Sequence, residues 1–358
     1  MNTRRRSKFL TGLFGLLMLF SLPHCDVVDI IVGEPSDNQD TLELAALAGL
    51  IPTPGDHFNR MYYINPLFSN DATNMNLVFE AGAEHVFSGR KKLILVHGWD
   101  FTDTNDKGYP DIGALKTRIT TDTWTFFLTT TEFQTITSAL GYDVYLYDYL
   151  TSDGIDVNGA RFRAKLDSLF ASSTEATTIF AHSMGGLVTR TALYTGDRPS
   201  YLTRVISAGT PYHGSPWASG AFQGDRSILG TLASFLTNTT GGLDLAWDNY
   251  DGSLDGASNA KLTALNAQTA RDDLLYVYYG SLPTLAVGAG AGDANGTLNA
   301  TCPLLGSTFA ESDCIVPVRS AQLAGNTPAI SRDLGNYDHF DVNLMNSTVR
   351  TILLADLP

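Results

Sequence analysis

The chain has 358 residues, 44% of them hydrophobic and 17% charged, so it is long and apolar enough to bury a large core and lacks the composition of a disordered protein. Its 37 acidic and 23 basic residues give a formal net charge of −14, and no cluster of Lys and Arg follows the first eight residues. The charge distribution therefore argues against a nucleic-acid partner.

Residues 1–24 have the pattern of a signal peptide. Three Arg and one Lys stand among the first eight residues, and residues 9–22 are mostly apolar. This apolar run is shorter than the roughly 17–25 residues that a membrane-spanning helix needs, but it suits a secretory signal. The sequence therefore predicts export.

The end of this segment resembles the lipoprotein box of bacterial signal peptides. Leu22 lies three residues before Cys25, although His24 stands where that box has a small residue. The resemblance implies that Cys25 is the lipid-modified N-terminus of a membrane-anchored protein of the cell envelope. A plain secretory signal and an uncleaved anchor remain as alternatives.

Cysteine usage agrees with export. If Cys25 carries lipid, Cys302 and Cys314 remain as an even pair in an oxidising compartment, which predicts a disulfide bond. The short loop that it closes would contribute roughly 3 kcal/mol in the chain-entropy model. Two unpaired thiols are the alternative interpretation.

The organisation expected from the sequence is a tether followed by one catalytic domain. Residues 25–57 are rich in turn-forming residues and are predicted to be a linker with one short helix at 42–50. From residue 58 to 358, short β-rich runs alternate with helical runs, which predicts an α/β fold with a mainly parallel central sheet flanked by helices. Strands are expected at 92–96, 143–149, 177–180, 204–207 and 274–279, and helices at 161–170, 187–194 and 341–354.

A strand–serine–helix turn is the strongest chemical signal. Residues 181–185 read Ala-His-Ser-Met-Gly, between a predicted strand and a predicted helix. This matches the G-x-S-x-G nucleophile turn of the α/β-hydrolase fold, with Ala181 in place of the first Gly. Ser183 is therefore the candidate nucleophile, and a serine that only caps the helix is the alternative.

A serine hydroxyl needs an adjacent base, and the order in this fold is serine, acid, histidine. Only His213 and His339 follow Ser183. His213 comes too early to leave room for a strand that carries the acid, so His339 is the predicted base.

The acid that orients this imidazole has several candidates. Asp313 is preferred, because it follows the strand expected at 274–279 after a long excursion, and Asp293 is the runner-up. Asp333 and Asp338 stand too close to His339 in the sequence.

Residues 97–99 read His-Gly-Trp directly after the strand expected at 92–96. In this fold the loop after that strand supplies one oxyanion donor, and the residue after the nucleophile supplies the other. The backbone N–H groups of Trp99 and Met184 are therefore the predicted oxyanion hole, and His97 is expected to be structural.

The order of five motifs resembles that of the true bacterial lipases of the α/β-hydrolase superfamily. In chain order these are HGW at 97–99, AHSMGG at 181–186, GTPYHGS at 209–215, DCIVP at 313–317 and DHFD at 338–341. The resemblance covers roughly residues 90–355, and the combination is far more specific than any single motif. The chain departs from the family pattern at Cys314, which replaces Gly, and at Tyr212, which precedes His213.

The resemblance implies two further features. The first is a structural calcium ion held by Asp341 and Asp293, because two carboxylates suit this hard cation; the alternative is that Asp341 caps the last helix. The second is a lid-like insertion at about 214–272. Its aromatic and aliphatic residues either cover an acyl pocket or belong to the ordinary core: Trp217, Phe222, Leu229, Leu232 and Phe235.

The function that the resemblance implies is a serine carboxylic-ester hydrolase acting on lipid esters through an acyl-enzyme. The chemistry requires no cofactor. A short-chain esterase, a thioesterase or an acyltransferase would carry the same three residues. A surface lipoprotein that only binds a lipid or a partner is a further alternative, against which the complete Ser, Asp and His set argues.

Overall fold

The computed structural model describes residues 59–70, 75–99, 127–219, 239–251, 258–284, 302–305 and 308–358. The chain divides into two compact units, residues 1–55 and 56–358. The first unit lies outside the described residues, and so do the predicted signal peptide, Cys25 and the helix expected at 42–50. The domain boundaries stay predictions.

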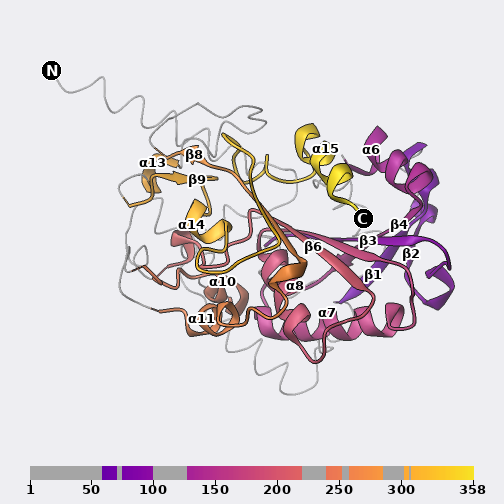
Figure 1. Ribbon diagram of the computed structural model, residues 1–358, viewed down its shortest axis with the longest axis horizontal. Helices are drawn as coiled ribbons and strands as arrows, with labels where there is room; N and C mark the ends of the chain where they lie inside the picture. Colours follow the sequence, from indigo (N-terminus) through magenta and orange to yellow (C-terminus); the bar gives the residue numbers. More distant parts are fainter. Residues whose placement is uncertain are drawn as a thin grey trace, which may run out of the picture. The chain divides into compact units, whose positions relative to one another are not determined.

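Within the described residues, an eight-stranded sheet organises the second unit (Figure 1). Its order is β10-β7-β6-β5-β3-β4-β1-β2, in which the strands from β10 to β4 run parallel and β1 and β2 are antiparallel to their neighbours. The strands are β1 (Arg60–Ile64), β2 (Val78–Glu80), β3 (Lys91–Val96), β4 (Tyr142–Asp148), β5 (Thr177–His182), β6 (Leu202–Ala208), β7 (Leu275–Tyr279) and β10 (Ile330–Asp333). Two short strands, β8 (Leu282–Pro283) and β9 (Glu311–Ser312), form a separate antiparallel pair.

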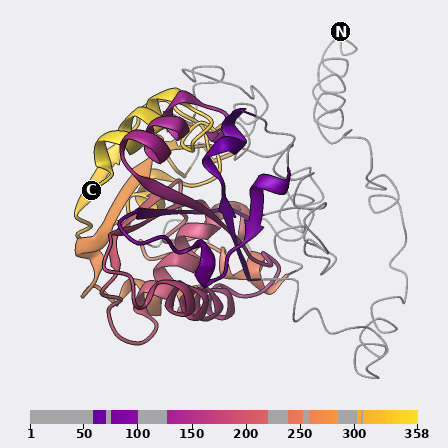
Figure 2. The ribbon, with the colours of Figure 1, turned by 90° about the vertical axis from the view of Figure 1, so that its right-hand side faces the viewer.

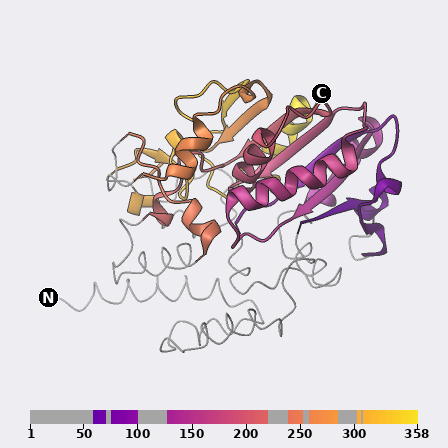
Figure 3. The same ribbon diagram turned by 90° about the horizontal axis from the view of Figure 1, so that it is seen from below.

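Helices cover both faces of this sheet. Figures 1 and 2 show α7 and α8 on one face and α6 and α15 on the other. Seen from below, α7 and α8 cross the strands side by side (Figure 3). The α-helices are α6 (Thr131–Gln134), α7 (Ile155–Phe170), α8 (Met184–Tyr194), α10 (Thr240–Asp244), α11 (Ala260–Asn266), α13 (Cys302–Leu305), α14 (Val318–Ala321) and α15 (Ser347–Asp356). The π-helical turn η5 (Thr135–Ala139) continues α6, and short 3-10 turns are η1 (Pro66–Asn70), η2 (Met75–Leu77), η3 (Ala83–His85), η6 (Pro216–Ala218) and η8 (Asp272–Leu274).

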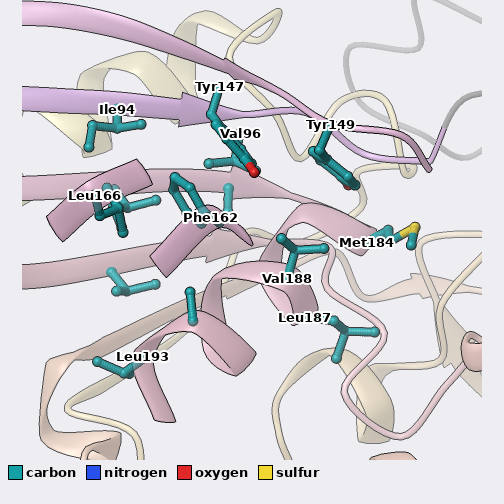
Figure 4. Packing of buried hydrophobic residues seen from close by; sticks show 14 of the residues in the cluster. Ile94, Val96, Tyr147, Tyr149, Phe162, Leu166, Met184, Leu187, Val188 and Leu193 are labelled. Atoms are coloured by element: carbon teal, nitrogen blue, oxygen red, sulfur yellow. The ribbon is translucent and has the colours of Figure 1, made fainter. Parts of the chain in front are cut away.

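The two-residue period of β3 explains these two layers. Alternate side chains of a strand point to opposite faces, and β3 is apolar on both. Ile94 and Val96 pack in the cluster that α7 and α8 cover, whereas Leu93 and Leu95 pack in the cluster on the other face. Figure 4 shows the first cluster, where Phe162 of α7 lies against the strands.

The parallel strands deliver the sequence motifs to one edge of the sheet. His97 follows β3, Ser183 follows β5, and Gly209 follows β6. Carboxyl ends of parallel strands meet at the same edge, which is where ligands bind in open α/β sheets. The α/β-hydrolase expectation of a mainly parallel sheet flanked by helices is therefore confirmed.

The final helix differs from the expectation. It was expected over 341–354, but α15 begins at Ser347, and the Asn346 side chain caps it by accepting from the N–H of Thr348. Residues 338–346 form turns instead, because Asp338 and Asn343 side chains bond to nearby backbone N–H groups. The alternative that Asp341 caps this helix is therefore wrong.

The insertion between β6 and β7 is described only in part, since residues 220–238 and 252–257 lie outside the described residues. Its second half is firmly attached to the domain. The Asp244 carboxylate accepts from the N–H of Ile155, at the start of α7, over 2.8 Å, and it also receives Lys261 at 2.7 Å. Among the described helices, none combines the length and apolarity needed to cross a bilayer.

Candidate functional site

Ser183 stands at the sharp turn between β5 and α8. Its φ of +54° and ψ of −129° are rare for a residue with a side chain. The turn is held by the Ser183 N–H, which donates to the Ala208 carbonyl over 2.9 Å. A Cβ added at Gly185 would lie 2.3 Å from the His97 carbonyl oxygen, so this position must be glycine for the helix to approach the loop after β3. The strained strand–serine–helix turn has the geometry of a nucleophile elbow.

His339 lies in the loop between β10 and α15 and reaches across to this serine. The Ser183 hydroxyl donates to Nε2 of His339 over 2.9 Å. Both side chains are nearly buried, with 8% of Ser183 and 6% of His339 exposed. A hydroxyl that donates to a neutral imidazole nitrogen is positioned to lose its proton to that nitrogen.

Asp313 completes the hydrogen-bonded series. Its Oδ2 accepts from Nδ1 of His339 over 2.7 Å, and its Oδ1 accepts from the N–H groups of Ile315 at 3.0 Å and Val316 at 2.6 Å. The side chain is fully buried. These bonds fix the carboxylate and the imidazole tautomer, because Nδ1 must carry the hydrogen. The three side chains singled out in the sequence are thus brought together in series, and their chemical roles stay predictions.

The turn that carries Asp313 is fastened on two sides. A disulfide bond joins Cys302 and Cys314, with their Cα atoms 4.4 Å apart. On the other side, Oγ of Ser215 donates to the Ile315 carbonyl at 2.6 Å and Nε1 of Trp217 donates to the Cys314 carbonyl at 3.1 Å. Residues of the 209–215 motif and its neighbours therefore hold the acid in place.

The sequence leaves two interpretations of Trp217, a lid residue or part of the ordinary core. It is 3% exposed and packs with Trp247, Leu305 and Phe309, so it belongs to a small core beneath the acid turn. The other residues considered for the lid, from Phe222 to Phe235, lie outside the described residues.

The loop after β3 passes directly over the serine. A Cβ added at Gly98 would lie 2.8 Å from Cβ of Ser183, and Trp99 is the next residue. His97 supports the loop: its Nδ1 donates to the Gly98 carbonyl at 2.7 Å, and its ring stacks on that of Tyr149 with the centroids 4.3 Å apart. The second predicted donor, the N–H of Met184, stands at the N-terminus of α8, where backbone N–H groups are unsatisfied by the helix.

His213 has other partners than the serine. Its Nδ1 lies 2.7 Å from Oδ2 of Asp248, its Nε2 lies 2.8 Å from the Ala324 carbonyl oxygen, and Tyr250 stacks on its ring with centroids 3.8 Å apart. This Asp–His pair fastens the second half of the insertion to the motif at 209–215. Both ring nitrogens are occupied, which agrees with the choice of His339 over His213 as the predicted base.

His182 is a feature of the site for which no role was predicted from the sequence. Its Nε2 donates to the backbone carbonyl of His339 over 2.8 Å. Burial, and secondly the neighbouring His339, lower the pKa of His182 to about 3. Its place beside the nucleophile was visible in the sequence, but its partner 157 residues away was not.

Of the two predicted calcium ligands, Asp341 and Asp293, the structure describes the first. Asp341 is buried in the turn after His339, whereas Asp293 lies outside the described residues. Within the described ranges, no group of three or more His, Cys, Asp or Glu side chains is arranged to hold a metal ion. Burial raises the pKa of Asp338, whose Oδ2 finds no hydrogen-bond partner among the described residues. These residues do not by themselves complete a calcium site, so no chemical step is assigned to a metal.

No protein-family model matches the sequence, and no curated protein matches it. Solved structures with a similar fold include the mature lipase BlEst2 of Bacillus licheniformis, which is 20% identical with a TM-score of 0.44 over 77% of this chain and 95% of that chain. Lipase 1 from Pelosinus fermentans is 12% identical with a TM-score of 0.41 over 76% of this chain and 100% of that one. A metagenomic carboxyl esterase is 17% identical with a TM-score of 0.41 over 71% of this chain and 66% of that one. At these identities the likeness concerns the fold alone, and the function has to be inferred from the site.

Proposed function

We propose that the protein is a serine carboxylic-ester hydrolase. The observation that carries the proposal is the continuous series from Ser183 through His339 to Asp313, with bonds of 2.9 and 2.7 Å, at a strained strand–helix turn. A serine with a purely structural role would not require the bonded His339 and Asp313 together with a strained turn. These features are what a nucleophile, a base and an orienting acid require.

The reaction follows from the geometry. Oγ of Ser183 attacks the ester carbonyl while Nε2 of His339 takes its proton, and Asp313 stabilises the resulting imidazolium. The N–H groups of Trp99 and Met184 stabilise the oxyanion, and each such donor contributes roughly 10²–10³ in rate. His339 then returns the proton to the leaving alcohol. Water, activated by the same imidazole, hydrolyses the acyl-enzyme and regenerates Ser183.

Lipid esters are the proposed substrates. The support is the motif series, which resembles that of bacterial lipases, together with an insertion after β6 where such enzymes carry a lid. A short-chain esterase, a thioesterase and an acyltransferase share the same chemistry at the serine. A series of p-nitrophenyl esters from acetate to palmitate, with a thioester and an alcohol acceptor added, separates the four activities.

Substitution of the nucleophile tests the proposal as a whole. Ser183→Ala is expected to lower turnover by roughly 10⁶, as for other serine hydrolases of this chemistry, and to abolish labelling by a fluorophosphonate. Ser168→Ala is the matched control, because that serine is exposed on α7 and bonds only within its own helix. Retention of more than a tenth of the activity by Ser183→Ala would refute the proposal.

We further propose that Cys25 carries acyl chains and anchors the enzyme in the bacterial cell envelope. The support is the basic and apolar leader and the spacing of Leu22 and Cys25. Mass spectrometry of the membrane fraction is expected to find an acylated Cys25 as the mature N-terminus. A soluble chain with a free N-terminus at another residue would contradict this anchor.

A structural calcium ion at Asp341 and Asp293 is the remaining proposal from the motif resemblance. Calcium is expected to raise the unfolding temperature of the chelator-treated protein, and Asp341→Asn to abolish that increase. Equal unfolding temperatures with calcium and with chelator would exclude the ion.

A further inference from the structure

His182 lies where three parts of the site meet. It is the last residue of β5 and directly precedes Ser183. Its Nε2 donates to the His339 carbonyl over 2.8 Å, and the two rings lie with centroids 4.8 Å apart at 45°. On its other side, a Cβ added at Gly98 would lie 3.2 Å from Nδ1 of His182, so the oxyanion loop is also in contact.

The imidazole of His182 is a hydrogen-bond donor with a fixed direction. With its pKa lowered to about 3 by burial and by His339, the ring is neutral in the working range of an ester hydrolase. A neutral imidazole has one N–H, and the carbonyl acceptor places it on Nε2. His182 therefore gives its only hydrogen to the backbone of His339 and does not compete as a base for Ser183.

We infer that His182 is a positioning residue that holds the backbone of His339 at the distance its imidazole needs. This inference rests on the proposed hydrolase function. The His339 ring must meet Ser183 and Asp313 at once, although these residues come from separate loops. The bond from His182 ties the peptide group of His339 directly to the nucleophile strand. A displacement near 1 Å in such a site costs on the order of 10²-fold in rate, so the bond bears on turnover more than on substrate binding.

Three substitutions of His182 distinguish the effect of losing the hydrogen-bond donor from the effect of losing the volume of the ring. In His182→Gln the amide nitrogen reaches roughly as far as Nε2, in His182→Asn it is one methylene short, and His182→Phe keeps a ring without a donor. We expect kcat to fall by about 10- to 100-fold in the Asn and Phe variants and by less than about fivefold in the Gln variant, with KM changing less than about threefold in all. His85→Phe is the matched control. His85 stacks on Tyr63 of β1 and Phe79 of β2, the last two strands in the sheet order, away from β5 and the site.

A spectroscopic measurement accompanies the kinetics and does not depend on activity. The downfield proton resonance of the His339 Nδ1–H bonded to Asp313 is expected in the parent, in His182→Gln and in His85→Phe. It should shift or broaden in the Asn and Phe variants. The same measurements and fluorophosphonate labelling are made on the parent protein.

The outcomes distinguish the two proposals. An active parent with equal kcat and an unchanged resonance in all three His182 variants would overturn the positioning role and leave the hydrolase intact. Equal losses in the Gln and Asn variants would also overturn it, because reach would then not matter. A parent without ester hydrolysis or labelling would overturn the proposed function itself. If the Phe variant does not fold, the comparison of Gln with Asn still decides.

Discussion

A Cβ added at Gly209 would lie 3.2 Å from Nδ1 of His339, so the glycine after β6 gives the imidazole its room. The same atom would lie 3.1 Å from Oδ2 of Asp313, and the φ of Gly209 is +59°. The nearest atom would be Cγ2 of Val342, at 2.9 Å, so Gly209→Ala would press a methyl group against Val342 as well as against the Asp313–His339 bond. Because these neighbours would have to yield by only a few tenths of an ångström, we expect kcat for ester hydrolysis to fall by about tenfold, less than the roughly 10²-fold that a displacement near 1 Å costs.

Gly196→Ala is the control that distinguishes the contact of the new methyl group with the site from the strain of a positive φ. Gly196 also has a positive φ, +66°, but a Cβ there would meet nothing within 4 Å. Both substitutions should cost roughly 1 kcal/mol of stability from the left-handed backbone, but only Gly209→Ala should lower kcat. Equal activity of the two variants would mean that the site tolerates the methyl group.

Replacement of the acid should act on the imidazole tautomer. Asp313→Asn keeps an oxygen for the N–H groups of Ile315 and Val316, but it turns an amide toward Nδ1 of His339. We expect turnover to fall by roughly 10⁴, as in other sites where the tautomer is disturbed, with the fold retained. Steady-state kinetics and circular dichroism measure the two effects.

The chain offers a matched control for this change in its second Asp–His pair. Asp248 and His213 are 2.7 Å apart, the same separation as Asp313 and His339. Asp248→Asn should lower the unfolding temperature, because it loosens the insertion, with turnover reduced less than tenfold. Asp293→Asn should likewise act through stability alone. If Asp293→Asn is the more damaging to turnover, the acid role moves to Asp293.

The sequence predicted the features that depend on local pattern. The runs at β3 and β5, the helix α8 and the turn at Ser183 are all encoded within about ten residues, so periodicity and turn chemistry suffice to find them. The strands β1 and β2 and the antiparallel pairing of β1 with β4 were not predicted, because which strands pair depends on contacts distant in the sequence.

The missed parts of the site involve pairs distant in the sequence. His182 and His339 form a hydrogen bond only when the folded chain brings them together, and the same holds for His213 and Asp248. The role of Gly209 was also invisible, since a glycine after a strand is usually a turn residue. The late start of α15 has a local cause: Asp338 and Asn343 bond to nearby backbone N–H groups and keep residues 338–346 in turns.

Stability at acid pH should report on His182. Its pKa is about 3 in the folded protein and 6.5 in the ordinary, exposed state. Between these values the unfolded chain binds the proton and the folded chain does not, so this group lowers the free energy of unfolding as pH falls from about 6.5 to about 3. Above 6.5 it has no effect on the pH dependence.

The free energy of urea unfolding, measured over this pH range for the parent and for His182→Gln, tests the assignment. Two titratable groups face His182, namely His339 and His97. Both remain in the two proteins, as do all carboxylates, so the difference between the slopes of unfolding free energy against pH comes from His182. We expect a shallower acid loss in the Gln variant. Parallel curves would show that His182 takes up its proton at the same pH in the folded and unfolded states, so that burial does not lower its pKa.

The disulfide should link stability to catalysis. The bond between Cys302 and Cys314 restrains the residue next to Asp313, and the acid works only when it is held within hydrogen-bonding distance of His339. Cys302→Ser, or reduction, should lower the unfolding free energy by roughly 3 kcal/mol in the chain-entropy model and lower turnover at the same time. Preference among p-nitrophenyl esters of different chain length should change little, because the bridge adjoins the acid rather than the acyl group.

The matched control is Cys25→Ser, which removes a cysteine far from the acid in the sequence and should leave turnover and stability of the detergent-solubilised protein unchanged. Thiol titration of the unfolded, unreduced mature protein checks the bridge directly, and no titratable thiol is expected once Cys25 is acylated. Two thiols from Cys302 and Cys314, identified by alkylation and peptide mapping, would show that they are not joined. The turn at Asp313 would then depend on the bonds from Ser215 and Trp217 alone, and reduction should change neither turnover nor unfolding temperature.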